Sequence, residues 1–193
     1  PNIIPLNIEV KSYTNKLQAY ADEWNTAKKK IVLIGVLDPN SIEQQFVNQL
    51  LEDESVVVFT ETTSNVHHEN IFSSIDQLIA PIEDKGFKKL QPEILLTFGG
   101  MIVSKKVKAF LRMYSPKQHW HVDSKKAFDT YFSLNKHFKT SPNKFLREFL
   151  PITKKADSAF RDEWLAIRKY RRERHVLYEK SIPFSDFKVF SEI

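Results

Sequence analysis

The chain has 193 residues, of which 41% are hydrophobic, and its formal net charge is +5. It contains no cysteine, which excludes disulfide-stabilised scaffolds and thiolate metal sites and favours a reducing, cytoplasmic location. No apolar run approaches the roughly 20 residues of a membrane-spanning helix, and the first residues lack the charged-then-apolar pattern of a signal peptide.

The N-terminal residues 1–13 are expected to be a linker from a preceding domain. Pro1–Ile8 alternates apolar and polar side chains without a turn or a helix cap, which is typical of an extended segment, and there is no initiating methionine. Over residues 15–29, apolar side chains recur every three or four positions. This spacing predicts a helix that leads into a buried strand over Ile31–Leu37.

A strand, turn and helix unit follows. Ser41 and Gln44 are predicted to form a capping box at the start of a helix with one apolar face. Val56–Phe59 is rich in β-branched residues and predicts a second buried strand, which ends in the polar loop Thr60–Asn65.

Two more strands follow an ambiguous segment. Residues 67–90 give a mixed pattern, in which a short helix is indicated near Ile75. Glu93–Phe98 is the third predicted strand, ending in the turn Gly99–Gly100, and Gln118–Val122 is the fourth. Between them a helix is predicted by apolar residues at helical spacing: Val103, Val107, Phe110, Leu111 and Tyr114.

The last elements complete the fold prediction. Leu134–Phe138 is a possible final strand, and Ser141 begins a helix that Pro151 ends. Short buried strands alternating with helices predict an α/β fold over residues 14–150: a doubly wound, Rossmann-like parallel sheet of five or six strands with helices on both faces. Residues 151–193 are expected to hold a connector helix and the start of a following domain, because an apolar face continues to the last residue without a glycine stop.

The strongest candidate site lies after the third predicted strand. Ligands of an open parallel sheet bind at the carboxyl ends of its strands, and here Gly99 and Gly100 permit a tight turn into a helix. Three polar side chains lie in or near the first turn of that helix: Ser104, Lys105 and Lys106. Free helix amides beside lysines predict a site for a carboxylate or phosphate; the alternative is a glycine turn followed by a solvated lysine face.

Other polar groups give weaker signals. Glycine spacing fits neither a dinucleotide fingerprint nor a P-loop, and for the Thr60–Asn65 loop a functional role is the less favoured interpretation. His119 and His121 share one strand face, but no third ligand stands at a recognisable spacing, so no metal site is predicted. The basic run Arg168–His175 is interpreted as a solvated helix face, or one facing an acidic domain, in preference to a nucleic-acid site.

Two runs carry a resemblance to a known family. Pro92–Lys106 (PEILLTFGGMIVSKK), followed by His119–Asp123 (HWHVD), resembles the central domain of the MenD family, the thiamine-diphosphate-dependent synthases of menaquinone biosynthesis. The segments Thr60–Asn65 and Phe128–Tyr131 are also similar. The resemblance covers most of the chain, from about residue 30 to 149, and residues 164–193 resemble the lead-in to the family's third domain.

The resemblance implies a three-domain transferase that acts as a homo-oligomer, a dimer or tetramer. The enzyme decarboxylates 2-oxoglutarate on thiamine diphosphate with magnesium and adds the resulting succinyl semialdehyde unit to isochorismate. The cofactor and the catalytic residues would lie outside this chain, which is expected to contact the other domains of the same polypeptide. Alone, the chain is expected to be inactive, to bind no cofactor, no metal and no nucleic acid, and to have no membrane span.

The resemblance also implies roles for particular residues. Lys105 matches a substrate-binding lysine of the family, and Lys106 stands where some members have arginine, so it would act as a point charge without the two-pronged contact. Ser104 is expected to take part in substrate binding, with possible loop contacts from Gly99, Gly100 and Asn65. The alternatives are a central domain of another thiamine-diphosphate-dependent enzyme, or a stand-alone module that binds an anionic partner or nucleic acid.

Overall fold

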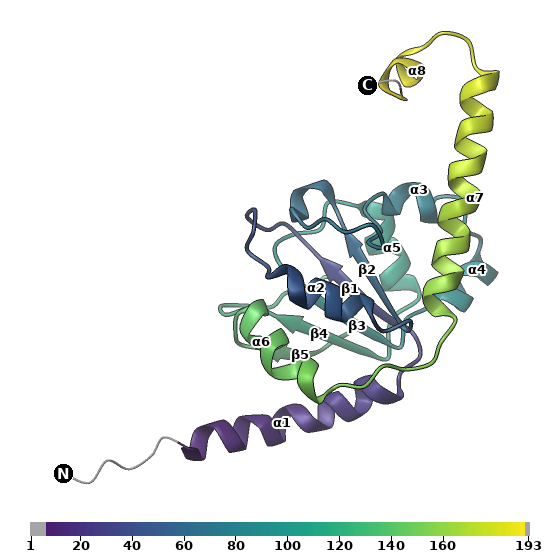
Figure 1. The fold of residues 1–193 in the computed structure, drawn as a ribbon. Helices are drawn as coiled ribbons and strands as arrows, with labels where there is room; N and C mark the ends of the chain where they lie inside the picture. The colour runs from purple at the N-terminus through teal and green to yellow at the C-terminus, as the bar shows by residue number, and fades with distance from the viewer. Residues whose placement is uncertain (1–6, 192–193) are drawn as a thin grey trace.

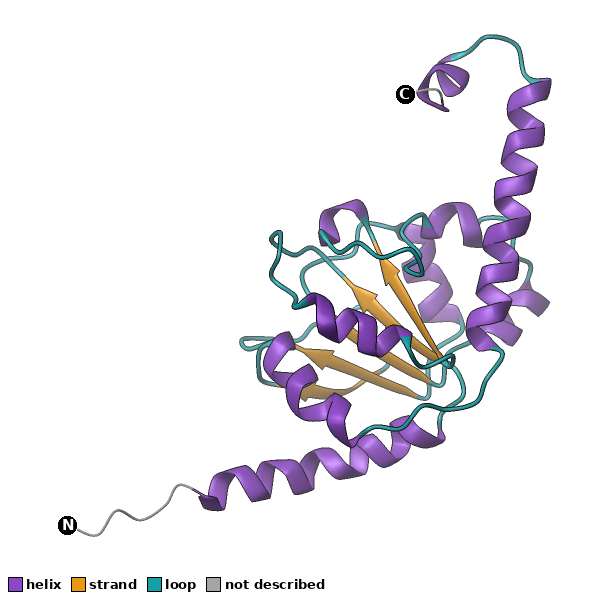
Figure 2. Ribbon diagram, in the orientation of Figure 1, coloured by secondary structure: helices purple, strands orange, loops and turns teal. Residues whose placement is uncertain are grey.

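The computed structural model describes residues 7–191, and side-chain surroundings for residues 17–189. A five-stranded parallel sheet forms its centre, with the strand order β2-β1-β3-β4-β5 (Figure 2). The strands are β1 Lys30–Ile34, β2 Val56–Thr60, β3 Ile94–Phe98, β4 Gln118–Val122 and β5 Leu134–Phe138. The predicted α/β fold with a parallel sheet is therefore confirmed.

Helices cover both faces of this sheet (Figure 1). Helices α1 (Asn7–Thr26), α2 (Gln44–Leu51) and α6 (Pro142–Phe149) pack on one face, and α3 (Ile75–Ile79), α4 (Asp84–Leu90), α5 (Lys105–Met113) and the first turns of α7 (Phe160–Ser181) on the other. Two short 3₁₀ helices, Thr62–Ser64 and Leu150–Ile152, and helix α8 (Asp186–Ser191) complete the described elements.

The pleat of the strands divides the core into two layers. Along β1, Val32 and Ile34 face the first layer, while Ile31 and Leu33 face the second. All four side chains are at most 1% exposed, because a parallel sheet covered on both sides buries both faces of its strands. This burial explains why the strands appear in the sequence as continuous apolar runs.

Large aromatic side chains fill both layers. In the first layer, the Trp24 ring lies 6.2 Å from that of Trp120 and 5.6 Å from that of Phe149. In the second layer, Trp164 is fully buried with its ring 4.9 Å from that of Phe59. Trp164 belongs to α7, so the packed core extends past the predicted boundary at residue 150, and the start of the connector helix is part of it.

The N-terminal helix begins earlier than the sequence pattern suggested. Helix α1 starts at Asn7, so residues 7–13 are helical where an extended linker was predicted, and residues 1–6 lie outside the described part of the chain. Once the apolar stripe that includes Leu17 and Trp24 docks on the sheet, extending the helix adds one hydrogen bond for each residue fixed, and no proline or glycine interrupts residues 7–26.

Two other local predictions differ from the structure. Helix α2 starts at Gln44 with Glu43 as its N-cap and no side-chain capping bond, so the predicted capping box with Ser41 does not form. Instead, Asn143 of α6 accepts a hydrogen bond from the Glu43 amide at 3.1 Å and donates one to the Ser41 carbonyl at 3.0 Å. Helix α4 lies in the segment whose pattern was mixed.

Within the described part of the chain, no helix has both the length and the apolar character needed to cross a membrane.

Candidate functional site

The loops after β1 and β3 meet at the carboxyl edge of the sheet. In the strand order β2-β1-β3, this is the switch point at which open α/β sheets bind ligands. The Gly35 amide donates to the Phe98 carbonyl at 2.9 Å, and the Gly100 amide to the Val36 carbonyl at 2.7 Å. A Cβ atom on Gly35 would lie 1.9 Å from the Gly100 carbonyl oxygen, and Gly99 has a φ of +82°. The glycines therefore allow two backbones to touch.

Helix α5 begins directly beyond this contact, and the amides of Val103, Ser104 and Val107 around its start are bonded to side chains of the chain. The Ser104 side chain caps the helix by accepting from the Val107 amide at 3.0 Å. The Glu61 carboxylate, from the loop after β2, accepts from the Val103 amide at 2.8 Å and from the Ser104 amide at 2.7 Å. The helix start does bind an anion, as its amides favour. Glu61 holds the amides of Val103 and of the N-cap residue Ser104, while the Lys105 and Lys106 amides of the first turn make no hydrogen bond among the described residues.

A second acid lies on the other side of the helix start. The Ser104 hydroxyl donates to the Asp76 carboxylate, and the same oxygen accepts from the Val107 amide. Ser104 thus has a structural role in this arrangement. The sequence pattern pointed to Ser104 as a candidate but not to Glu61 or Asp76 as its partners.

The two lysines of the predicted site are solvent-facing. Lys105 and Lys106 occupy the first two positions of α5 and are both exposed. Among the described residues, neither side chain has a hydrogen bond or an ion pair. Asn65, another predicted contact, adopts a left-handed conformation and donates to the Leu37 carbonyl at 2.7 Å, which ties the loop after β2 to the loop after β1.

A cavity of about 500 Å³ adjoins the glycine contact and reaches β4. At its polar wall, the Thr97 hydroxyl lies 3.0 Å from His119 Nε2 and 2.8 Å from His121 Nδ1. Burial lowers the pKa of His119 to about 4, and burial also lowers the pKa of His121. Both imidazoles are therefore neutral at pH 7. The expectation that they share a strand face is confirmed, since both reach the same threonine.

Comparison with known proteins places this fold in a family. A family model described as "Middle domain of thiamine pyrophosphate" matches residues 7–186. The chain belongs to this middle-domain family of thiamine-pyrophosphate enzymes.

Individual relatives of this middle domain share one name, 2-succinyl-5-enolpyruvyl-6-hydroxy-3-cyclohexene-1-carboxylate synthase. The protein of that name from Flavobacterium psychrophilum is 49% identical over 99% of this chain and 34% of its own length. The one from Christiangramia forsetii is 53% identical over 100% of this chain and 35% of its own length. The one from Flavobacterium johnsoniae is 47% identical over 88% of this chain and 31% of its own length. The resemblance found in the sequence is confirmed, and the chain spans about a third of the length of these curated relatives.

The middle domain offers no evident ligands for a metal ion. Among the described residues, no three or more histidine, cysteine, aspartate or glutamate side chains lie close enough together to hold one. His68, in the loop after the first 3₁₀ helix, uses its Nδ1 to accept from the Asn70 amide at 3.1 Å.

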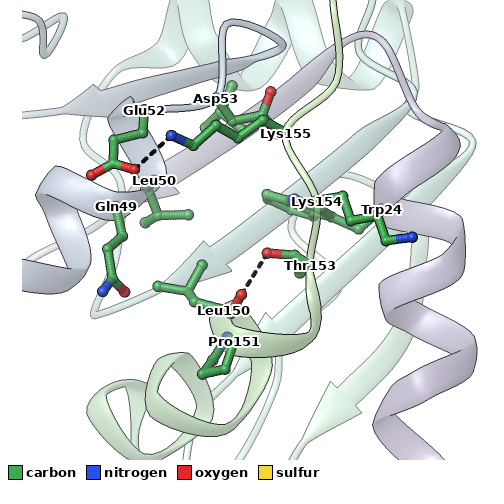
Figure 3. Close-up of a pocket in the computed structure, with 11 residues that line it drawn as sticks. Trp24, Gln49, Leu50, Glu52, Asp53, Leu150, Pro151, Thr153, Lys154 and Lys155 are labelled. Carbon is green, nitrogen blue, oxygen red and sulfur yellow. Dashed lines mark hydrogen bonds and ion pairs between the residues drawn. The ribbon is translucent and has the colours of Figure 1, made fainter.

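A separate recess of about 330 Å³ lies at the opposite, amino-terminal edge of the sheet (Figure 3). Its lining includes Trp24 and Asp53, and an ion pair of 2.8 Å joins Lys155 to Glu52 across it. Because ligands of such sheets bind beyond the carboxyl ends of the strands, this recess is not a candidate site of the middle domain. Of its two acids, Glu52 pairs with Lys155, and Asp53 pairs with the buried Lys30.

Part of the basic run on α7 is used inside the middle domain. The Arg168 guanidinium donates to the carbonyls of Glu69 at 3.0 Å and Ile71 at 3.2 Å, and it lies 4.8 Å from the centre of the Phe72 ring. The arginine therefore fastens α7 to the loop that follows β2. The rest of the run is mostly exposed, as in the interpretation of a solvated helix face.

Proposed function

We propose that this chain is the middle domain of a thiamine-diphosphate-dependent, cytoplasmic synthase of menaquinone biosynthesis. The whole enzyme would release carbon dioxide from 2-oxoglutarate and join the remaining succinyl semialdehyde unit to isochorismate. The observation that carries the proposal is the identity of 47 to 53%, over most or all of the chain, to relatives named as the synthase of that product. We further propose that the enzyme is a homo-oligomer.

The cofactor and its magnesium are assigned to the parts of the enzyme beyond this chain. Thiamine diphosphate, when bound, supplies the carbanion chemistry of the reaction. The contribution of the middle domain would be to bind substrate through side chains at the start of α5.

Lys105 and Lys106 are proposed to bind substrate carboxylates. Both substrates are dicarboxylates, and these two exposed ammonium groups are without partners in the described structure. Glu61 holds the Val103 and Ser104 amides, so attraction for a substrate anion would come from the two lysine side chains and from the amides of the same two residues. An exposed ion pair contributes only about 0–1 kcal/mol, so we expect the contribution to grow when other domains exclude water from the site.

The test is steady-state kinetics of the full-length enzyme with thiamine diphosphate, magnesium and both substrates. Lys105→Ala should raise the KM for one carboxylate substrate about tenfold, equivalent to about 1.4 kcal/mol, with kcat little changed. Lys106→Arg should lower that KM if arginine restores a two-pronged contact. Lys88→Ala is the matched control, because Lys88 is an exposed lysine on α4 at the other end of the sheet.

Two outcomes would contradict the proposal at different levels. A full-length enzyme that forms no product from these substrates would refute the assigned reaction. A normal reaction with unchanged KM values in Lys105→Ala and Lys106→Ala would refute the role of the lysines alone.

A further inference from the structure

Glu61 connects three strands at the carboxyl edge of the sheet. It follows β2, while the helix whose amides it binds follows β3, and β1 lies between them. The Ser64 hydroxyl accepts from the Glu61 amide at 2.9 Å and donates to the Ile34 carbonyl at the end of β1 at 2.7 Å. Ser64 therefore fixes the backbone of Glu61 relative to β1, and the Glu61 side chain extends from this fixed backbone to the start of α5.

The bonds made by this carboxylate fix the backbone that carries the lysines. Both carboxylate oxygens are used, one on the Val103 amide and one on the Ser104 amide, and Lys105 is the next residue. Two lysines in the first turn oppose the helix dipole, which favours negative charge at that end. Glu61 supplies the negative charge that offsets this effect.

We infer that Glu61 is a positioning residue for Lys105 and Lys106. The inference rests on the proposed function of these lysines in substrate binding. Glu61 does not contact substrate in this arrangement: it holds the start of α5 so that the two ammonium groups leave the helix in a fixed direction. Its carboxylate holds the Val103 and Ser104 amides, which directly precede the two lysines at the start of the helix.

Charge alone predicts the opposite result, and this difference makes the inference testable. A negative group beside the lysines repels a substrate anion, so simple removal of the charge should strengthen substrate binding. If Glu61 positions the lysines, its loss should weaken substrate binding in spite of this gain.

Asp76 provides the matched control. Glu61→Gln and Asp76→Asn each remove one negative charge near the start of α5. Asparagine still has an oxygen that can accept the single hydrogen bond from Ser104, whereas glutamine has one acceptor for two amides and turns an N–H group toward the other. In the full-length enzyme, Glu61→Gln should raise the KM for the carboxylate substrate about three- to tenfold with kcat little changed, while Asp76→Asn should leave that KM unchanged or lower it.

A second measurement does not depend on activity. In the 193-residue chain, amide hydrogen exchange followed by NMR should show the Val103 and Ser104 amides exchanging at least about tenfold faster in Glu61→Gln than in Asp76→Asn, because only the first substitution breaks their bonds. Thermal unfolding of both variants checks that the domain is intact. Glu61→Asp, whose shorter side chain cannot reach both amides, replaces Glu61→Gln if the latter does not fold.

The outcomes separate this inference from the proposed function. A raised KM in Lys105→Ala and Glu61→Gln, but not in Asp76→Asn, supports both. A raised KM in Lys105→Ala with an unchanged or lowered KM in Glu61→Gln overturns the positioning role only, as does an equal increase in Glu61→Gln and Asp76→Asn. Unchanged kinetics in Lys105→Ala and Lys106→Ala removes the proposed lysine site, and the positioning role with it.

Discussion

The buried His119 predicts that the domain loses stability in mild acid. Its side chain is 1% exposed, with its ring 5.4 Å from that of Tyr131, and burial lowers its pKa from 6.5 to about 4. Between these values the unfolded chain binds a proton that the folded chain does not, so the free energy of unfolding falls as the pH falls through this window. Integration gives a loss of about 2 kcal/mol between pH 7 and pH 5, and about 3 kcal/mol in total below pH 4.

Urea unfolding at pH 7, 6 and 5 measures this loss, in a range where most carboxylates stay ionised. His121 adds a loss of the same sign, because burial lowers its pKa as well. The informative variant is His119→Gln, which removes the titrating group and keeps an amide able to bond to Thr97. It should reduce the pH dependence by about 2 kcal/mol over the same interval. Equal pH dependence in the variant and the parent chain, or an NMR titration of His119 near 6.5, would refute the reasoning.

Three substitutions test the packing that supports the site. Lys30→Met should destabilise the domain by about 3–5 kcal/mol in urea unfolding, because it leaves the buried carboxylate of Asp53, 2.8 Å from the Lys30 ammonium, without its partner; a loss below about 1 kcal/mol would contradict this. Gly35→Ala should lower the thermal midpoint, since its Cβ would overlap the Gly100 carbonyl, and an unchanged midpoint would mean that the loops separate freely. Trp164→Ala should cost about 3–5 kcal/mol by leaving a cavity, and proteolysis should then cut α7 first, whereas cleavage elsewhere would count against its anchoring role.

The sheet could be predicted because its strands are buried on both faces. In β1 and β2 every residue is buried, and all but Lys30 and Thr60 at the strand ends are apolar, so each strand appears in the sequence as a short apolar run. Helix boundaries were less predictable. Helix α4 has one buried residue, Leu90, and the ring of Phe87 packs on Phe110 at 5.0 Å, a contact that depends on the position of another helix. The sequence of α4 therefore carries little periodic signal of its own.

The candidate site was predictable in its location but not in its bonding. Glycines after a strand and lysines at a helix start are local patterns, and the structure places both at the carboxyl edge. The carboxylate of Glu61 lies 42 residues before the Val103 amide that it binds, and the contact exists because the strand order puts β2 and β3 on either side of β1. Strand order is a property of the tertiary structure. Residue spacing in the sequence therefore could not show which acid accepts from the Val103 and Ser104 amides.

The two ends of the sheet differ in how their lysines are partnered. At the amino edge, the buried ammonium of Lys30 bonds to the Trp24 carbonyl at 2.9 Å and to Asp53 at 2.8 Å, so these two buried charges have partners inside the domain. At the carboxyl edge, Lys105 and Lys106 stand at the end of a helix that disfavours cations, which lowers the stability of the helix on its own. Residues that lower the stability of a helix, such as lysines in its first turn, are expected where a function requires them. The carboxylate of Glu61 then offsets the cost through backbone amides and leaves both ammonium groups free to contact a ligand.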